Sequence, residues 1–594
     1  MIFGKYINRY YLKNAPLLLL GLAALVLVDF FQLKVPELYR MVINGTNSGE
    51  VVGDGQTMAF TMDVLLDKIC LPMIWIILAM VFGRFLWRVC FFNAAVRTET
   101  DLRNKMFDHS RMLSQEYYQV NKVGNLMSLY TNDLDTIQEC FGDGVLMFFD
   151  ALLLGLLAII KMWRMDHLLT LLSLIPMAFL LVVGSGLGKV MVKKWEERQQ
   201  AFSDLSDFAQ ESYSGIAVIK AFVKEYKELN AFRKLNKENE EINVVYTRIS
   251  TLLNIMVGLF VESVICVILG YGGYLVYQGK FNAGQLVEYI GYFSAIVWPI
   301  MAVAMLIEKT SRGKASLNRV SELLDAEIHV KDRPGAKEKE HIDGKIEFKN
   351  LTFRYPGGEY DVLKNVSFVI NPGERVGIVG KTGAGKTTLV DLILRTYNVK
   401  DGTLFIDDQD VNDLTIHSVR EGCAYVPQDS FLFSDTIERN IGFSFDEADQ
   451  SQVELAAKLA DVHENIIDFK DGYETILGER GVTVSGGQKQ RISIARALMK
   501  NASVLILDDS VSAVDTKTER IILDNLKKQK GRTILLIAHR ISTVEEMDKI
   551  IFLDDGEVKA VGPHAELYAS CEEYRKMVDL QKLEEEERKG ETNA

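Results

Sequence analysis

Six apolar stretches constrain the fold of this 594-residue chain more than any other feature. They lie at 15–42, 68–92, 141–162, 167–188, 251–277 and 285–307. Each is long enough for a helix to cross a hydrocarbon core of about 30 Å, and a helix satisfies its own backbone polar groups there. The first part of the chain is therefore expected to form a membrane domain of six helices.

The distribution of lysine and arginine predicts the orientation of these helices. The connection 189–250 holds 11 such residues and 93–138 holds five, whereas 43–67 holds none. Because positively charged connections stay on the cytoplasmic side, both long connections and both ends of the domain are expected there. The same two connections are polar and regularly patterned, so their helices are expected to extend well beyond the bilayer. The N-terminal residues 1–16 resemble an interfacial helix that leads into the membrane.

Composition excludes several other classes of protein. A net charge of −13 argues against a nucleic-acid binder, which would present a basic face. The six cysteines are scattered without a C-x-x-C pair, so neither a disulfide framework nor a zinc site is indicated. The chain is expected to be a multi-pass protein of the cell membrane, in contact with the lipid bilayer.

The character of the sequence changes after the last apolar stretch. The membrane domain is assigned to residues 1–315, and 316–344 reads as a charged linker. Short apolar runs then alternate with helical patterns over 345–580, which is typical of an α/β domain. Residues 581–594 form an acidic tail, expected to be solvated.

A phosphate-binding loop opens the chemistry of this second domain. Residues 380–388 read GKTGAGKTT, which fits G-x-x-x-x-G-K-[ST] between a strand-like and a helical segment. Backbone amides would hold phosphates, Lys386 would neutralise the β and γ oxygens, and the Thr387 hydroxyl would bind Mg²⁺. ATP and Mg²⁺ are the expected ligands. The residues assigned to nucleotide binding are Gly380, Lys381, Thr382, Gly383, Ala384, Gly385, Lys386, Thr387 and Thr388.

Further motifs follow in an order that resembles the nucleotide-binding domain of an ATP-binding cassette transporter. They are Tyr355, the phosphate loop, Gln428 in YVPQDS, Ser485–Gln488 in SGGQ, Asp508 in LILDDS and His539 in IAHRIS. On spacing alone, Ser485 could equally be a plain helix N-cap. Because six apolar stretches precede a single cassette, the chain resembles exporter half-transporters, and the loops 124–137 and 211–225 resemble their coupling loops.

The resemblance implies a role for each motif residue. Tyr355 would stack on adenine, and His539 would contact the γ-phosphate. Gln428 and Asp508 would meet the magnesium ion, and Gln428 would also touch the attacking water. The signature residues would complete an ATP site on a second half-transporter, because two cassettes sandwich two nucleotides head to tail. Those signature residues are Ser485, Gly486, Gly487 and Gln488.

The acid that follows Asp508 is Asp509, where such sites usually carry a glutamate. The shorter side chain withdraws the carboxylate that would polarise the water by about 1.5 Å. A misplacement of about 1 Å can cost on the order of a hundredfold in rate. The pattern resembles the low-activity half of bacterial heterodimeric multidrug exporters. The alternatives are that small shifts keep Asp509 an active base, that the chain is a homodimeric lipid flippase or peptide exporter, or that it is a membrane sensor that binds ATP without pumping.

Three acids within the apolar stretches mark a candidate substrate cavity: Asp29, Asp150 and Glu262. Ionisable groups at such depth are costly and commonly functional, and carboxylates favour cationic, amphipathic small molecules. Aromatic residues nearby would suit the same ligands; they are Phe30, Phe31, Phe148, Phe149, Phe260 and Trp298. The alternative is a structural role, with the acids paired to Arg84 or Arg88.

Overall fold

A computed structural model describes residues 3–53, 56–478, 481, 483–511, 514–529 and 531–592, without the side chains of 52, 53, 56, 177, 180–189, 304 and 584–592. The chain forms two compact units. One consists of Met1–Arg111 and Gly124–Asp325, and the other of Met112–Val123 and Ala326–Ala594.

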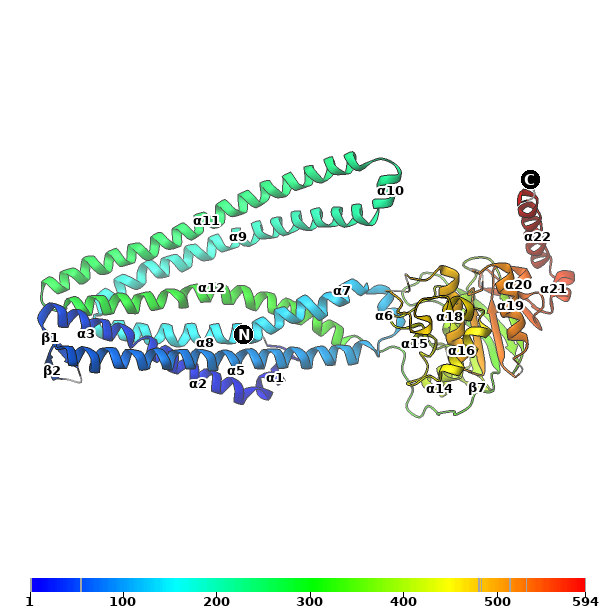
Figure 1. The fold of residues 1–594 in the computed structure, drawn as a ribbon, viewed down its shortest axis with the longest axis horizontal. Coiled ribbons are helices and arrows are strands. Elements are labelled where there is room, and N and C mark those ends of the chain that lie inside the picture. The colour runs from blue at the N-terminus through cyan, green and yellow to red at the C-terminus, as the bar shows by residue number, and fades with distance from the viewer. Residues whose placement is uncertain are drawn as a thin grey trace. The chain divides into compact units, whose positions relative to one another are not determined.

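The first unit is built of long helices (Figure 1). They are α2 (Ala15–Gln32), α3 (Val35–Ser48), α5 (Leu71–Ser110), α8 (Leu134–Met165), α9 (His167–Ser214), α11 (Glu225–Tyr277) and α12 (Ala283–Asp325). With 53 residues, α11 is about 80 Å long at about 1.5 Å per residue, far more than a bilayer needs. The helix is therefore long enough to extend beyond a bilayer, as the sequence predicted.

Five helical segments of the described residues are long and apolar enough to cross a membrane. They are Ala15–Ser48, Met62–Ser110, Val123–Met165, Glu225–Tyr277 and Ala283–Asp325, and they contain five of the six predicted stretches. The remaining stretch, 167–188, lies on α9, where the side chains of 177 and 180–189 fall outside the described residues. The first predicted stretch forms two helices, α2 and α3. Pro36 lies in the first turn of α3, where the backbone N–H groups have no partner within the helix, so proline is tolerated there.

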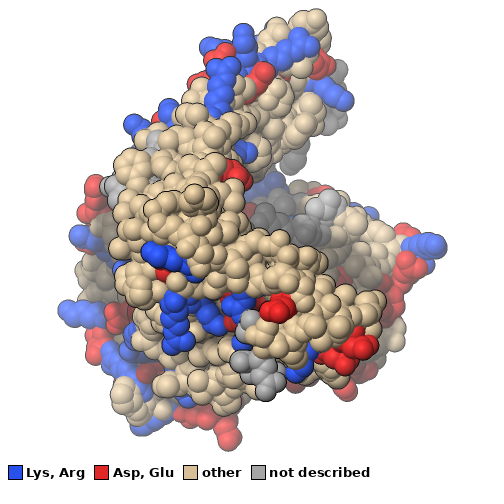
Figure 2. Space-filling model, turned by 90° about the vertical axis from the view of Figure 1, so that its left-hand side faces the viewer, with Lys and Arg blue, Asp and Glu red and all other residues tan. Residues whose placement is uncertain are grey.

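Helix packing in this unit is close and pairwise. Helix α2 packs against α5, α8 against α12, and α9 against α11. A Cβ at Gly83 of α5 would lie only 2.6 Å from Cγ2 of Val28 on α2, so glycine permits this approach. The pair α9 and α11 diverges from the other helices of this unit and ends at the short α10 (Ile216–Ala221), which joins the two (Figure 1). Figure 2 looks onto the end that carries β1 (Glu50–Gly53) and β2 (Gln56–Ala59), and shows broad areas without charged side chains.

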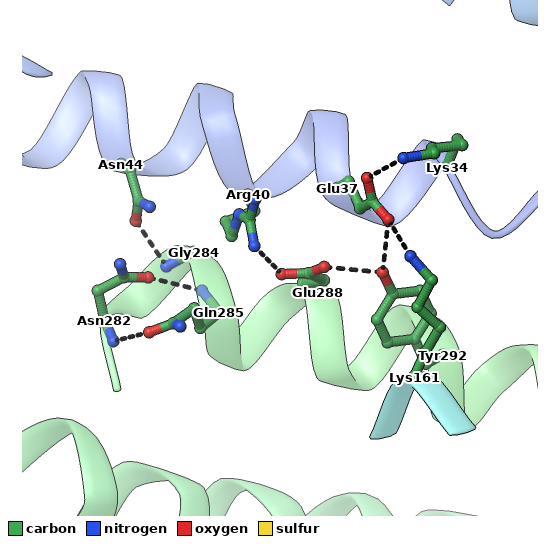
Figure 3. A network of polar contacts seen from close by, with 10 residues as sticks. All are labelled: Lys34, Glu37, Arg40, Asn44, Lys161, Asn282, Gly284, Gln285, Glu288 and Tyr292. Carbon is green, nitrogen blue, oxygen red and sulfur yellow. Dashed lines mark hydrogen bonds and ion pairs between the residues drawn. The ribbon is translucent and has the colours of Figure 1, made fainter. Parts of the chain in front are cut away.

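A polar network ties α3 to α12 and α8 (Figure 3). Arg40 Nη1 donates to Glu288 Oε2 at 2.9 Å, and the Tyr292 hydroxyl donates to Glu288 Oε1 at 2.7 Å. Lys161 of α8 donates to Glu37 Oε1 at 2.5 Å. Glu288 is buried, so its negative charge depends on Arg40 and Tyr292 for compensation.

The second unit is an α/β domain around a six-stranded sheet of order β12-β11-β5-β10-β9-β8. The strands are β5 (Arg375–Val379), β8 (Cys423–Val426), β9 (Val504–Asp508), β10 (Thr533–Ile537), β11 (Lys549–Asp554) and β12 (Glu557–Gly562). All neighbours are parallel except β11 and β12. Every residue of β9 and β10 is buried, as in a parallel sheet covered on both faces. The helices that bear on the site are α13 (Lys386–Ile393), α18 (Gly486–Met499) and α19 (Thr516–Lys527).

A smaller antiparallel sheet has the order β4-β3-β6-β7. Its strands are β3 (Ile346–Phe353), β4 (Leu363–Ile370), β6 (Leu404–Ile406) and β7 (Gln409–Asp410). A helical membrane domain followed by an α/β cassette is the predicted fold class, and it is confirmed. Helix α12 continues through residues 316–325 of the segment predicted as linker, and the predicted tail extends α22 (Glu572–Thr592).

Residues 112–123, with α6 (Gln115–Val120), belong to the cassette's unit although they lie between α5 and α8 in the sequence. Glu116 Oε2 lies 2.9 Å from Nδ1 of His329, and the Gln119 side chain hydrogen-bonds Tyr397. The segment that docks on the cassette therefore precedes the loop 124–137 that the resemblance suggested.

Candidate nucleotide-binding site

The site lies where four neighbouring parallel strands end. Ile537 of β10 is in register with Ile378 of β5 and with Asp508 of β9, and Leu507 of β9 pairs with Val426 of β8. Because the carboxyl ends of parallel strands meet at one edge, motifs separated by more than a hundred residues converge there. The phosphate loop, Gln428, Asp508 and His539 all follow or end these strands.

A cavity of about 360 Å³ opens at this edge. Its lining residues are Tyr355, Tyr360, Val362, Thr382, Gly383, Gly385, Lys386, Thr387, Thr388, Gln428, Asp508, Asp509, Ile537 and His539. The structure thus brings together Gln428, the two aspartates, His539, Tyr355 and six residues of the phosphate loop. Tyr360 and Val362 were not singled out from the sequence, where no motif marks them.

Three predicted loop residues, Gly380, Lys381 and Ala384, do not line this cavity. The side chain of Lys381 points instead to Asp554, with Nζ 3.3 Å from Oδ1. Gly380 has a backbone role, because a Cβ there would lie 2.0 Å from the carbonyl oxygen of Leu553. Only glycine allows this approach of loop and strand.

Lys386 begins helix α13, and Gly385 before it has a φ of 96°. A Cβ at Gly385 would lie 2.7 Å from Leu363 Cδ2, so both conformation and space require glycine. Lys386 Nζ donates to the carbonyl oxygens of Gly380 (2.8 Å) and Lys381 (2.9 Å). Burial lowers the pKa of Lys386, against the effect of Asp509 and Asp508. A phosphate anion at the helix N-terminus would favour the charged lysine.

Asp508 and Thr387 form a donor set suited to Mg²⁺. The Thr387 side chain hydrogen-bonds the carboxylate of Asp508, and Oδ2 of Asp508 is buried without a hydrogen-bond partner. Burial raises the pKa of Asp508, so a cation at this oxygen would offset the cost of its charge. Among the described residues, no cluster of three or more His, Cys, Asp or Glu could hold a metal. A hydroxyl, one carboxylate and phosphate oxygens are the usual ligands of Mg²⁺ at nucleotide sites.

Asp509 lies beside His539 in the lining of the cavity. Its backbone has a φ of 47°, and its N–H donates to the carbonyl oxygen of Ile537 at 3.0 Å. Oδ2 of Asp509 lies 3.7 Å from Nε2 of His539. The carboxylate is thus directed to the place where a γ-phosphate and an attacking water would lie.

Tyr355 is held by its neighbours. Its hydroxyl lies 2.8 Å from Oγ1 of Thr388, and its ring meets Tyr397 edge-on at 5.1 Å. Tyr360 lines the same cavity and is 74% exposed. Two aromatic side chains are therefore available for stacking on a base, where the sequence suggested one.

The signature residues lie apart from this cavity, at the N-terminus of α18. Ser485 Oγ accepts from the Gln488 N–H at 3.3 Å, and Gln488 Oε1 accepts from the Ser485 N–H at 3.0 Å. This reciprocal capping box satisfies the N-cap interpretation that the sequence left open. Ser485 and Gly486 are exposed, so the helix N-terminus is accessible to a ligand held by another surface.

A second cavity, of about 350 Å³, lies among α2, α5, α8 and α12 of the membrane unit. It contains Asp29, Asp150 and Trp298 of the predicted substrate residues, and also Arg84 and Arg88. The other predicted aromatics do not line it. Glu262 is exposed on α11 and does not line it either. The structure therefore joins two of the three predicted acids and separates the third.

Comparison with known proteins agrees with both units. The family described as the ABC transporter transmembrane region matches residues 18–300, and the ABC transporter family matches residues 363–512. The multidrug resistance-like ATP-binding protein MdlA of Buchnera aphidicola is 34% identical over 97% of this chain and 98% of its own. An ATP-dependent lipid A-core flippase of Syntrophus aciditrophicus is 33% identical over 87% of each chain.

A solved structure of similar extent is that of a bacterial Atm1-family ABC exporter with ATP bound. It covers 97% of this chain and 98% of its own, with a TM-score of 0.76 and 26% identity. The match spans the helical unit and the cassette, and the motifs above supply an ATP site at the strand ends. The chain therefore belongs to the ABC transporter family, as a multi-pass membrane exporter whose transmembrane domain and ATPase cassette are fused in one polypeptide and whose ATPase is coupled to transport.

Proposed function

We propose that this chain is one half of a heterodimeric ABC exporter that moves amphipathic small molecules, including drugs, out across the cell membrane. Its N-terminus and cassette lie in the cytoplasm, on the side of the lysine- and arginine-rich connections. The names of several relatives, such as MdlA, refer to multidrug resistance. Those names support a small-molecule substrate, and Asp509 supports the heterodimer.

The observation that carries the proposal is the short acid Asp509 in an otherwise complete site. Lys386, Thr387, Gln428, Asp508 and His539 all reach the cavity. Asp509 faces His539 at 3.7 Å, but its carboxylate ends one carbon–carbon bond, about 1.5 Å, short of a glutamate's reach. This site would bind ATP and turn it over slowly, because water would not be held in line for attack.

The signature residues of this chain are expected to act at the partner's ATP site. Ser485 to Gln488 cap α18 at an exposed helix N-terminus outside this chain's own cavity. In the proposed dimer they complete the partner's ATP site, where a glutamate would be the working base. Mg²⁺ would be held in this chain's site by Thr387 and Asp508, with Gln428 beside it, and would neutralise phosphate charge.

We place the substrate cavity at Asp29 and Asp150, which share a hollow with Trp298 in the membrane unit. Glu262, exposed on α11, is a separate candidate contact on the substrate path. Removing its charge by Glu262→Gln should weaken ATP-dependent uptake of a cationic dye by inverted vesicles and spare basal ATPase activity. Equal dye uptake by both proteins would remove Glu262 from the path.

A homodimeric lipid flippase is the second candidate, favoured by the 33% identity to the lipid A-core flippase. One experiment separates the two. The chain is purified alone and together with a second, distinct half-transporter that carries a glutamate at the position corresponding to Asp509. Our proposal expects ATP binding but weak ATPase activity from the lone chain, and both strong activity and dye transport from the pair. Vigorous ATPase activity and lipid translocation by the lone chain would favour the homodimer.

A further inference from the structure

The cavity of the membrane unit holds a carboxylate that lacks a partner. Asp29 on α2 is 1% exposed, and its Oδ2 is buried without a hydrogen-bond partner. The same side chain lines the cavity of about 350 Å³ together with Asp150 of α8. A buried oxygen of this kind is costly unless a proton or a cation reaches it.

Asp29 and Asp150 lie within hydrogen-bonding reach of each other. Two carboxylates this close cannot both carry a charge without compensation. The simplest compensation, when no substrate is bound, is a single proton shared by the pair. One oxygen of Asp150 is already occupied, because Trp298 Nε1 donates to its Oδ2 at 2.7 Å. The proton would therefore bridge the remaining oxygens of the pair.

The other charged groups of the cavity do not replace this proton. Arg84 and Arg88 of α5 line it, and α12 contributes Trp298 rather than a charge. Arg84 donates to Gln32 Oε1 at 3.4 Å, and the Arg88 guanidinium lies 5.3 Å from the Trp87 ring centre. Within the described chain, neither arginine hydrogen-bonds the two acids, and Arg84 acts on Asp29 only through its charge at a distance. Arginine keeps its proton at physiological pH, so only the carboxyl pair can release one.

We propose that Asp29 and Asp150 share one proton in the empty site and exchange it for the positively charged group of an organic cation. The cation enters between the two carboxyl groups, and the displaced proton passes to water. The pair changes from one negative charge to two while the cation adds one positive charge, so the net charge of the site is unchanged. The aromatic faces of Trp298 and Trp87 are suited to the cation's apolar arms.

The inference rests on the proposed export of amphipathic molecules and narrows their class to cations. Its test uses tetraphenylphosphonium, a permanent cation that has no proton of its own to release. Binding to the purified protein in nanodiscs is measured calorimetrically in two buffers of different ionisation enthalpy, which counts the protons released. The wild type should release about one proton per bound cation, and its affinity should rise by up to about tenfold per pH unit while the pair is protonated.

The Asp29→Asn and Asp150→Asn variants should release almost no proton and bind at least about tenfold more weakly, because a coordinating charge is lost. Glu37→Gln is the matched control, since Glu37 is a membrane-domain acid already paired with Lys34 and Lys161. It should leave the proton count unchanged. ATP photolabelling of each variant verifies folding, and having two variants keeps the test valid if one of them is unstable.

The outcomes distinguish the exchange from the export function. Binding by the wild type without proton release, unchanged release by both asparagine variants, or no binding at all overturns the exchange. Proton release without ATP-dependent accumulation of tetraphenylphosphonium in inverted vesicles overturns the proposed export and leaves the exchange standing. Accumulation of tetraphenylphosphonium without proton release overturns the exchange and leaves the proposed export standing.

Discussion

Nε2 of His539 lies 3.7 Å from Oδ2 of Asp509, and both residues line the cavity that would receive the γ-phosphate of ATP. The two residues follow adjacent parallel strands, and the N–H of Asp509 is bonded to Ile537 at the end of the strand that leads to His539. The backbone under the aspartate is therefore fixed by the sheet. Any gain in reach toward the water must come from a longer side chain.

Lengthening this acid should raise turnover. In the heterodimer, Asp509→Glu extends the carboxylate by about 1.5 Å and should increase ATPase activity at this chain's site by at least about tenfold. Asp509→Asn should reduce total activity only modestly, because the partner's glutamate supplies most turnover. Steady-state ATPase assays, with the partner's glutamate changed to glutamine in parallel, measure both. Loss of most activity in Asp509→Asn would identify Asp509 as the working base.

Removing the loop lysine should weaken nucleotide binding at this chain's own site. Lys386 is buried, and its ammonium donates to the loop carbonyl oxygens of Gly380 and Lys381, so it is held at the loop that would bind the β and γ phosphates. Lys386→Ala should lower photo-crosslinking of ATP to this subunit by at least about tenfold. Lys381→Ala is the matched control, because that lysine pairs with Asp554 outside the cavity. Equal labelling of both variants would refute the assignment of Lys386.

The sequence predicted the site better than it predicted the membrane cavity, and the reason is physical. Motif residues follow strands, and a parallel sheet brings strand ends together whatever the loops do, so Gln428, Asp508 and His539 converge as expected. Asp29 and Glu262 both lie in predominantly apolar stretches, and hydropathy alone cannot say which helix face is turned inward. Their separation depends on packing between helices. Tyr360 was missed because a loop aromatic carries no periodic signal.

The signature serine should matter more to the partner than to this chain. Ser485→Ala removes an N-cap acceptor and should cost about 1 kcal/mol of folding stability. It should also reduce turnover at the partner's site, while ATP photolabelling of this chain's own site is retained. Asp449→Ala, which removes the N-cap of α16 (Gln450–Leu459), controls for the cap alone. Similar ATPase losses in both variants would mean that Ser485 acts only as a cap.

Asp391 on α13 should make stability depend on pH. Burial, with the nearby Asp508, raises its pKa from 3.8 to about 6. The folded protein then binds this proton more tightly than the unfolded chain, so the contribution of Asp391 to stability falls as pH rises from about 4 to about 6 and is constant above that. Asp391→Asn cannot ionise, so its melting temperature relative to wild type should rise over the same interval. Melting temperatures of both proteins are measured from pH 4 to 7 without nucleotide. A difference between them that does not change with pH would contradict the assignment.

The polar network on α3 and α12 should be essential to the packing of the membrane unit. Glu288 is 4% exposed and depends on Arg40 at 2.9 Å for its compensating charge (Figure 3). Arg40→Ala leaves that carboxylate buried with only the Tyr292 hydroxyl and should cost about 3–5 kcal/mol of folding stability. Adding Glu288→Gln to Arg40→Ala removes the unpaired charge and should restore a large part of the loss.

Thermal unfolding in detergent measures this coupling. Lys34→Ala is the control, because Glu37 keeps its second partner, Lys161, when Lys34 is removed. That control should shift the melting temperature much less than Arg40→Ala. Additive effects of the two network substitutions would mean that Arg40 and Glu288 act independently, since residues joined by a direct ion pair give non-additive double mutants.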